Sequence, residues 1–518
     1  MAFPERDPKG QVWADLEKKQ DWGICFSGGG TRAAACAVGQ LRALQQLNLL
    51  QETRYISAVS GGSWTATPFT FLPDGVEKFL GEYVPPGQLT CSNLAACEGS
   101  MLHAISKAFV TGRGLGGLAA GRGSESYARV ISKLFLAPFG LGDNKRWFTW
   151  NATTANEVIK ENPLLKERAY TVAPGRPFLI VGGTIRHYDS SPMRWKNDPI
   201  KRVPVEFTPL YSGVRPSIVP AKYNRKPIGG GYVESFAYDS KNAKKSADKT
   251  QEAEVTLYKR LPWRTEPLLN LGDIMGSSGA APGEFSLLVE LFGFPKFDHW
   301  SPAALDNDGV ASSARYAHQD GGLSENLGLI PLLGRQVKRI IAFVNAEDEV
   351  IVGNGPARFP DYINGLFGRT PCGWFEATQV FPSNGLDDIA NQLAARVREG
   401  RAAIARTSLS TLANTRFGVG QYEVEVCWVF LDARLGGENR KASQSWISQL
   451  PPLTGSDSDV RKLVQSDRFP RYRTFFEDRP VPLWDVIRLT PEKATSLAHY
   501  TSWVLVSEAQ DITSFLCK

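Results

Sequence analysis

The stretch that most constrains the fold is WGICFSGGGTRAAACAVGQL, residues 22–41. A short apolar run (22–27) ends in three consecutive glycines (28–30), and an alanine-rich segment with helical spacing of its apolar residues (31–47) follows. This order predicts a buried strand, a sharp turn and a helix. The first N–H groups of such a helix have no partner within it and attract negative charge. The turn therefore indicates a phosphate site or an oxyanion hole, and a turn needed only for tight packing is the structural alternative.

Nucleotide binding does not fit this turn. A phosphate loop needs a Lys followed by Ser or Thr, or the G-x-G-x-x-G spacing. Here Gly30 is followed by Thr31, Arg32 and Ala33, so neither pattern is met. Residues 111–124 do contain the G-x-G-x-x-G spacing, but a helix-like segment precedes them instead of a strand. We therefore expect a mobile loop there and no dinucleotide site.

A second strand-to-helix turn lies in YISAVSGGSW, residues 55–64. An apolar run leads to Ser60, and small residues flank it at Ala58 and Gly62, as a sharp nucleophile elbow requires. A serine in such a turn can also be ordinary loop chemistry. The two turns are about thirty residues apart, which fits one β-α-β unit with both turns at the same sheet edge. One turn then offers a nucleophile, and the other offers N–H donors for the charge that its attack creates.

A serine hydroxyl needs a proton acceptor. The segment HQDGGLSENLGLIPLL (318–333) contains Asp320, followed by two glycines that allow a tight turn. With Asp320 as the acceptor, the site would be a Ser-Asp dyad. A triad would instead need one of the five histidines. His318 would face the same side of a strand as Asp320 and is a minor candidate, and His499 stays open. The structural alternative for Asp320 is a turn aspartate that bonds its own backbone.

The order of apolar and helical segments predicts the fold class. Further runs with β-branched or aromatic residues indicate buried strands at 55–60, 177–183, 339–346 and 423–433. Residues 386–407 have the apolar spacing of a helix. Strands that alternate with helices predict a three-layer α/β/α architecture around a mostly parallel sheet. Long loops are expected at 111–124, at the lysine-rich 240–250 and at 450–458.

Charge, cysteines and hydropathy limit the partners and the location. The net charge of +6 fits weak attraction to anionic surfaces, but ordinary solvated surface charge is the favoured explanation. Seven cysteines without a C-x-x-C pair favour a reducing compartment. The first twenty residues lack an apolar signal region, and no run approaches the length of a bilayer span. We expect a cytoplasmic or peripheral membrane protein with no metal, no cofactor and no nucleic-acid partner.

Taken together, three segments resemble the patatin-like and cytosolic phospholipase A2 superfamily. Residues 27–33 are similar to its S-G-G-G-x-R-A segment, and residues 320–327 match D-x-G-L-x-x-N-L at every fixed position. Residues 58–64 resemble G-x-S-G-S-x-W, with alanine and glycine at two positions where the family has glycine and serine. Trp64 favours the cytosolic phospholipase A2 branch.

The resemblance implies a single lipid acyl hydrolase domain over residues 1–518, with large insertions. The core motifs lie within 22–346, and residues 347–518 complete the same domain. It further implies a serine lipid acyl hydrolase that cleaves fatty acyl esters of phospholipids or lysophospholipids at a membrane surface. The alternatives are a lipid acyltransferase and a catalytically idle lipid-binding protein of the same fold. The apolar segment 285–297 is expected to be core, or a lid or surface-docking segment.

The resemblance also assigns roles to residues. The implied site has Ser60 as nucleophile and Asp320 as base. The oxyanion hole is formed by the N–H groups of Gly29 and Gly30, with Gly61 as a further donor. Arg32 is implied to hold the substrate phosphate, and its structural alternative is an ion pair.

Overall fold

The computed structural model of the chain describes residues 3–107, 125–165, 169–186, 202–215, 228–246, 253–256, 269–280, 295–369, 375–452, 458–464, 468–473 and 489–516. The loop predicted at 111–124 lies outside these ranges, and so do most of 285–297 and the greater part of 450–458. The prediction that residues 1–518 form one domain stays a prediction.

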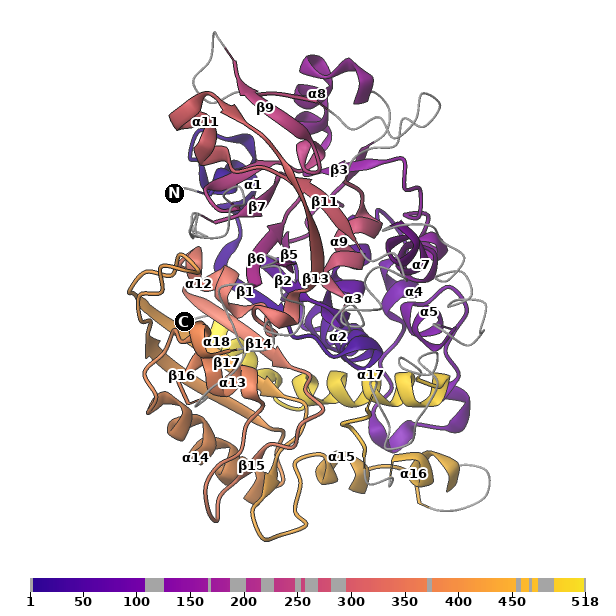
Figure 1. The fold of residues 1–518 in the computed structure, drawn as a ribbon. Coiled ribbons are helices and arrows are strands. Elements are labelled where there is room, and N and C mark those ends of the chain that lie inside the picture. The colour runs from indigo at the N-terminus through magenta and orange to yellow at the C-terminus, as the bar shows by residue number, and fades with distance from the viewer. Residues whose placement is uncertain are drawn as a thin grey trace.

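Eleven strands of the described part form one large sheet (Figure 1). Its five central strands are parallel, in the order β17 (Glu423–Phe430), β14 (Arg339–Val344), β1 (Gln20–Phe26), β2 (Thr53–Val59) and β5 (Phe178–Arg186). These are the five strands that the sequence predicts, and the α/β fold class with a parallel centre is confirmed.

Both edges of the sheet are antiparallel, which the sequence did not predict. One edge strand is β16 (Ile404–Ser410), and on the other side follow β6 (Arg202–Phe207), β7 (Tyr211–Val214) and β8 (Gly231–Glu234). In addition, β13 (Ala314–Asp320) pairs antiparallel with both β5 and β11 (Lys296–His299).

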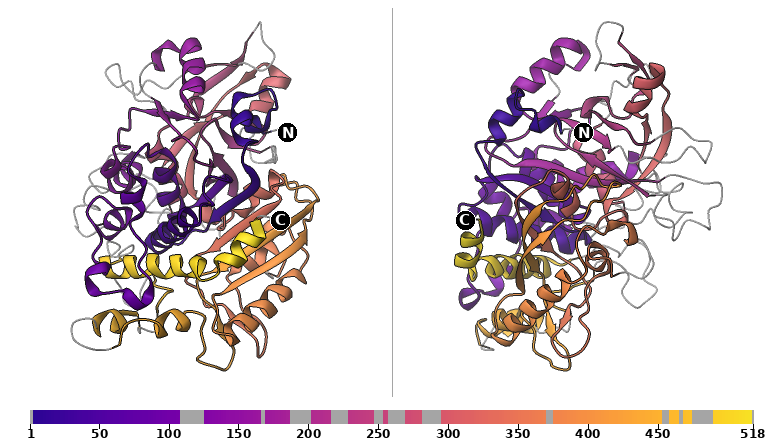
Figure 2. Two further views of the ribbon diagram at one scale, coloured as in Figure 1. Left: turned by 180° about the vertical axis from the view of Figure 1, so that it is seen from behind. Right: turned by 90° about the vertical axis from the view of Figure 1, so that its left-hand side faces the viewer.

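Helices cover both faces of the parallel centre. From β1 the chain passes through α2 (Gly30–Gln46) to β2 on one side, whereas from β14 it passes through α13 (Asp361–Leu366) and α14 (Gly385–Arg398) towards β17 on the other. Phe26 of β1 stacks on Phe343 of β14 beneath α3 (Gly61–Phe71), whereas Trp428 of β17 packs on Phe367, which follows α13. Val429 is in register with Phe343, so Trp428, one residue earlier, points to the opposite face. In both views of Figure 2 the yellow α17 (Pro491–Val506) lies along the indigo α2, on which it packs.

The remaining elements are small sheets and further helices, of which α3 and α9 are almost wholly buried. The minor strands are β3 (Trp147–Thr149) with β4 (Ala169–Thr171), β9 (Lys241–Lys245) with β10 (Ala253–Thr256) and β12 (Val310–Ala311), and β15 (Ile351–Val352) with β18 (Arg434–Leu435). The other α-helices are α1 (Gln11–Leu16), α3 (Gly61–Phe71), α4 (Val76–Leu80), α5 (Met101–Lys107), α7 (Glu125–Phe135), α8 (Ala152–Glu161), α9 (Leu271–Ser278), α11 (Pro302–Asp308), α12 (Leu329–Gly334), α15 (Gln444–Ser448), α16 (Ser458–Val464) and α18 (Ala509–Leu516). Among the helices of the described residues, none has both the length and the apolar character that a bilayer crossing requires.

Two local predictions are wrong. The helix predicted over 386–407 ends at Arg398, because Gly400 adopts a left-handed φ of 69° and stops it. Ile404 then begins β16 instead of continuing a helical face. In the segment predicted as a loop at 240–250, residues 241–245 form strand β9. Ala243 of this strand is fully buried in a small cluster with Trp300, and that burial holds the strand in place.

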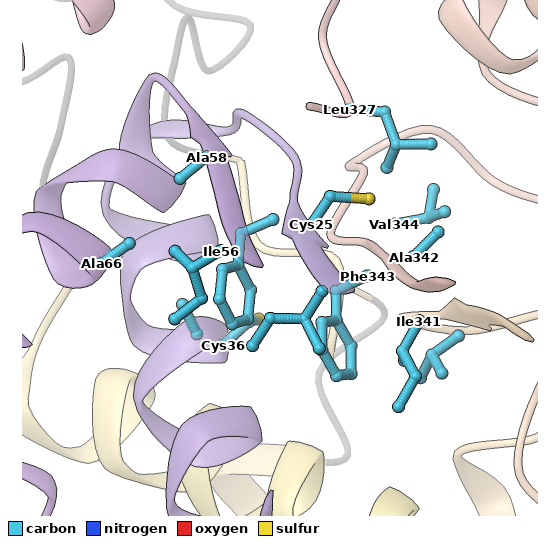
Figure 3. Close-up of a cluster of buried hydrophobic side chains, with 14 of the residues drawn as sticks. Cys25, Cys36, Ile56, Ala58, Ala66, Leu327, Ile341, Ala342, Phe343 and Val344 are labelled. Atoms are coloured by element: carbon cyan, nitrogen blue, oxygen red, sulfur yellow. The ribbon is translucent and has the colours of Figure 1, made fainter. Parts of the chain in front are cut away.

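A dense apolar core lies beneath the two glycine turns. Figure 3 shows side chains from β1, β2 and β14 packed against α2 and α3. Phe26, at the end of β1, stacks on Phe343 of β14 with ring centroids 5.1 Å apart. Cys25, Cys36 and Ile56 are fully buried in the same cluster. The ends of β1 and β2 are therefore anchored by packing on both faces of the sheet.

Candidate active site

The pairing of β5 brings two distant chain segments together. One edge of β5 pairs with β6. The other edge pairs with β2 along its first half and with β13 along its second half. The parallel strand β2 ends with Val59 opposite Gly182, and the antiparallel β13 ends with Asp320 opposite the next residue, Gly183. The two strands meet end to end, and the residue that follows Val59 lies beside Asp320.

At this junction the side chains of Ser60 and Asp320 are in contact. Ser60 Oγ donates a hydrogen bond to Asp320 Oδ2 at 2.8 Å. The other carboxylate oxygen, Oδ1, accepts the N–H of Gly322 at 2.8 Å, which fixes the orientation of the carboxylate. Both side chains belong to residues that are only 4% exposed. The hydroxyl therefore has a proton acceptor in a place from which most water is excluded.

The backbone at Ser60 is strained in the way that a nucleophile elbow requires. Its φ of 51° and ψ of −126° are unfavourable for a residue with a side chain, and such conformations persist where the surroundings impose them. The N–H of Ser60 donates to Ser278 Oγ at 2.8 Å, and Ser278 Oγ donates to the carbonyl of Gly182 at 2.6 Å. The carbonyl of Ser60 accepts Ser63 Oγ at 2.6 Å.

The glycine turn after β1 lies directly against this elbow. A Cβ atom on Gly61 would be 2.0 Å from the carbonyl oxygen of Gly30, and one on Gly28 would be 3.1 Å from Ser60 Cβ. Gly29 and Gly30 have φ values of 136° and 57°, which favour glycine. Gly30 is the first residue of α2, and Gly61 is the first residue of α3. The structure thus brings the starts of two helices together beside Ser60.

Arg32 lies in the first turn of α2, and its guanidinium group contacts protein atoms. Nε donates to the carbonyl of Asn345 at 3.1 Å. Nη1 donates to the carbonyl of Tyr472 at 2.8 Å and to Glu347 Oε2 at 3.2 Å. The side chain is 3% exposed. The ion pair with Glu347 is the structural alternative that the sequence left open for Arg32, and its role towards a phosphate stays a prediction.

The two histidines that the sequence left open are engaged elsewhere. The His318 ring is within hydrogen-bond distance of the Tyr238 hydroxyl at 2.7 Å and of the Tyr316 carbonyl at 3.1 Å. His499 Nδ1 accepts the N–H of Val84 at 3.2 Å. Burial lowers the pKa of each imidazole to about 3. Both rings are therefore neutral at physiological pH and bonded within the core.

Two residues around the dyad were missed by the sequence reasoning. Ser278 ends α9 and receives the N–H of Ser60. Tyr127, in α7, donates its hydroxyl to the carbonyl of Gly279 at 2.5 Å. Burial, together with the negative charge of Asp320, raises the pKa of Tyr127 well above its ordinary value. The run of small residues around Ser278 was the signal available for that residue, whereas no sequence pattern pointed to Tyr127.

The described ranges contain no group of three or more His, Cys, Asp and Glu side chains that could hold a metal ion. That the protein needs no cofactor stays a prediction.

The parallel centre covered by helices defines an α/β protein with its candidate site at the carboxyl ends of the strands. Within that class the similarity is to human GIVD cytosolic phospholipase A2. One solved structure of it has 14% identity, covers 97% of this chain and 60% of its own, and gives a TM-score of 0.48. Another, in complex with methyl gamma-linolenyl fluorophosphonate, has 12% identity, coverages of 99% and 60%, and a TM-score of 0.45. This chain thus spans 60% of the length of these structures. No protein-family model and no curated protein matches it in sequence.

Proposed function

We propose that this chain is a serine lipid acyl hydrolase that cleaves fatty acyl esters of phospholipids or lysophospholipids. The observation that carries the proposal is the 2.8 Å hydrogen bond from Ser60 Oγ to Asp320 Oδ2 at a strained elbow. It supports ester cleavage by a Ser-Asp dyad. The lipid class of the substrate rests on the resemblance of residues 27–33, 58–64 and 320–327 to the motifs of lipid acyl hydrolases.

In the first half-reaction Ser60 Oγ attacks the ester carbonyl carbon. The hydroxyl proton passes to Asp320 Oδ2, a bond forms between Oγ and the carbonyl carbon, and the carbonyl electron pair moves to the oxygen. When this tetrahedral species collapses, the bond to the alcohol oxygen breaks. The leaving alcohol takes the proton from Asp320, and the acyl group stays on Ser60.

In the second half-reaction water takes the place of the alcohol. A water molecule gives its proton to Asp320 while its oxygen attacks the acyl carbon. Collapse then releases the fatty acid and returns the proton to Ser60 Oγ. The same carboxylate acts as base in each attack and as acid in each collapse.

The oxyanion is stabilised by amides at the starts of α2 and α3. The first N–H groups of a helix have no partner within that helix, and they carry partial positive charge. We assign this role to the N–H groups of Gly29, Gly30 and Gly61. The close approach of Gly61 to the Gly30 carbonyl supports the assignment, because it joins the two helix starts beside the nucleophile. Loss of one such donor costs about 2.7–4 kcal/mol of transition-state stabilisation.

Product analysis tests the proposal. Native chain, Ser60→Ala and Asp320→Asn are incubated with vesicles of mixed phospholipids, with and without an added acceptor alcohol, and the lipids are identified by mass spectrometry. We expect free fatty acid and lysolipid from the native chain and neither from Ser60→Ala. Acyl-alcohol in place of fatty acid would indicate an acyltransferase. If the native chain converts no lipid, the remaining alternative is a catalytically idle lipid-binding protein.

A further inference from the structure

In the described part of the chain, three of the five N–H groups of the Arg32 guanidinium are bonded to protein, and the two on Nη2 remain. A guanidinium binds a phosphate bidentately through a pair of neighbouring N–H groups, either Nε with Nη2 or Nη1 with Nη2. In this chain Nε is bonded to the Asn345 carbonyl, and Nη1 is bonded to the Tyr472 carbonyl and to Glu347. Each pair therefore has one nitrogen already engaged with protein.

The surroundings of Arg32 also disfavour an anion. The Glu347 carboxylate is 3.2 Å from Nη1 and would repel a phosphate brought to the same group. The backbone of Glu347 is also fixed, because Arg471 Nη1 donates a hydrogen bond to the Glu347 main-chain carbonyl at 3.1 Å. The Arg32 side chain is only 3% exposed, so a phosphate has little access to it.

The same guanidinium packs against the glycine turn. A Cβ atom on Gly29 would be 2.5 Å from Arg32 Nη2. The Asn345 backbone that accepts Nε donates its own N–H to Ser27 Oγ at 2.8 Å. The Asn345 side chain exchanges hydrogen bonds with Gln40 at 2.8 and 3.2 Å. Arg32 therefore connects the turn that carries Gly29 and Gly30 to the end of β14 and to the segment around Tyr472.

We infer that Arg32 is a positioning residue that holds the Gly29–Gly30 turn in register with Ser60, and that it is not the ligand of a substrate phosphate. The inference rests on the proposed function and deepens it. It implies that the site acts on the acyl ester itself and that Arg32 contributes equally to esters with and without a phosphate. A misplacement of about 1 Å in such a turn can cost about 10²-fold in rate.

Two substrates separate the two roles. Nitrophenyl butyrate is an ester without phosphate, and palmitoyl-lysophosphatidylcholine carries one. For Arg32→Lys, which keeps the charge but lacks the planar fork, we expect kcat to fall by about 10-fold or more on both substrates by the same factor. KM should change by less than about 3-fold, since substrate contacts are kept. A loss confined to the phosphate substrate and expressed in KM would overturn the inference.

Glu347→Gln gives a second variant, for which the two roles predict opposite results. Its side chain is 38% exposed, so folding should be kept. A positioning role predicts that kcat falls on both substrates while the KM of the phosphate substrate stays unchanged. A phosphate ligand predicts that this KM decreases, because a competing anion has been removed. The matched control is Glu425→Gln. The Glu425 side chain is 37% exposed, close to that of Glu347, and it pairs with Arg339, so its loss should change neither constant.

A measurement without substrate keeps the inference independent of the proposed function. Hydrogen exchange of a peptide covering residues 27–41 should be faster in Arg32→Lys and Glu347→Gln than in the native chain and in Glu425→Gln. Unchanged exchange in both variants would overturn the inference. If the native chain shows no Ser60-dependent hydrolysis, the proposed function fails, and the exchange result still decides the role of Arg32.

Discussion

The contact between Gly61 and Gly30 gives the sharpest prediction about the elbow. In Gly61→Ala the new methyl carbon would lie 2.0 Å from the Gly30 carbonyl oxygen, 2.7 Å from its carbonyl carbon and 2.8 Å from its nitrogen. All three are backbone atoms, so no flexible side chain can move aside. The elbow and the glycine turn must separate for the methyl group to fit.

The size of that separation sets the expected loss. Ordinary contact begins at 3.4 Å, so the gap must open by 3.4 minus 2.0, which is 1.4 Å. Displacements of about 1 Å between reacting groups cost about 10²-fold in rate. We therefore expect kcat of Gly61→Ala to fall by at least about 10²-fold, equivalent to about 2.7 kcal/mol of barrier. That figure lies at the lower end of the loss of one oxyanion donor.

The assay combines ester hydrolysis with thermal melting. Gly182→Ala is the matched control in the same region, because its Cβ would meet only a Val59 methyl group at 3.3 Å and the Ala58 carbonyl oxygen at 3.9 Å. The control should keep kcat within about 3-fold, since a shift of a few tenths of an ångström relieves the contact. A Gly61→Ala chain that melts like the native one and keeps native kcat would refute the reasoning that this backbone contact sets the oxyanion geometry.

Three further results are expected. Asp320→Asn keeps the shape of the side chain but removes the proton acceptor, so kcat should fall by about 10²–10⁴-fold, and native turnover would return the base to His318 or His499. Ser278→Ala leaves the N–H of Ser60 buried without its acceptor and should lower kcat with KM unchanged, whereas Ser278→Thr should restore it; equal rates in both variants would contradict this role. Burial lowers the pKa of His318 from 6.5 to about 3, so the unfolded chain binds a proton below pH 6.5 that the folded chain does not. Stability should be full above pH 6.5 and fall as the pH drops towards 3, and urea melts of His318→Gln should show a shallower fall; parallel curves would argue against a neutral buried imidazole.

Local sequence signals were sufficient for the parallel centre of the fold. An apolar run before the glycines at 28–30 and another before Ser60 specify strand, turn and helix, because buried parallel strands and tight turns leave distinct residue patterns. Gly400 was the local signal missed at the end of α14, and its left-handed φ explains why the helix stops there. The antiparallel edges could not be predicted, because pairing between distant strands leaves no periodicity within either one.

In the candidate site, too, short motifs predicted some residues, whereas contacts between distant segments could not be predicted. The positions of Ser60 and Asp320 were predicted from short motifs, and the structure places their oxygens 2.8 Å apart across 260 residues of sequence. Their catalytic roles stay predictions. The partners of Arg32 could not be predicted, since the Tyr472 carbonyl is 440 residues away and any residue type offers such an acceptor.

The central claim is that Asp320 activates Ser60 for attack on an acyl carbon. The most direct test is the rate at which a fluorophosphonate probe modifies the chain, with the modified residue identified by peptide mass spectrometry in the native chain, Ser60→Ala and Asp320→Asn. We predict one adduct, on Ser60, formed rapidly in the native chain, absent in Ser60→Ala and slowed by at least about 10²-fold in Asp320→Asn. An adduct on another residue, or equal rates in the native chain and Asp320→Asn, would contradict the claim.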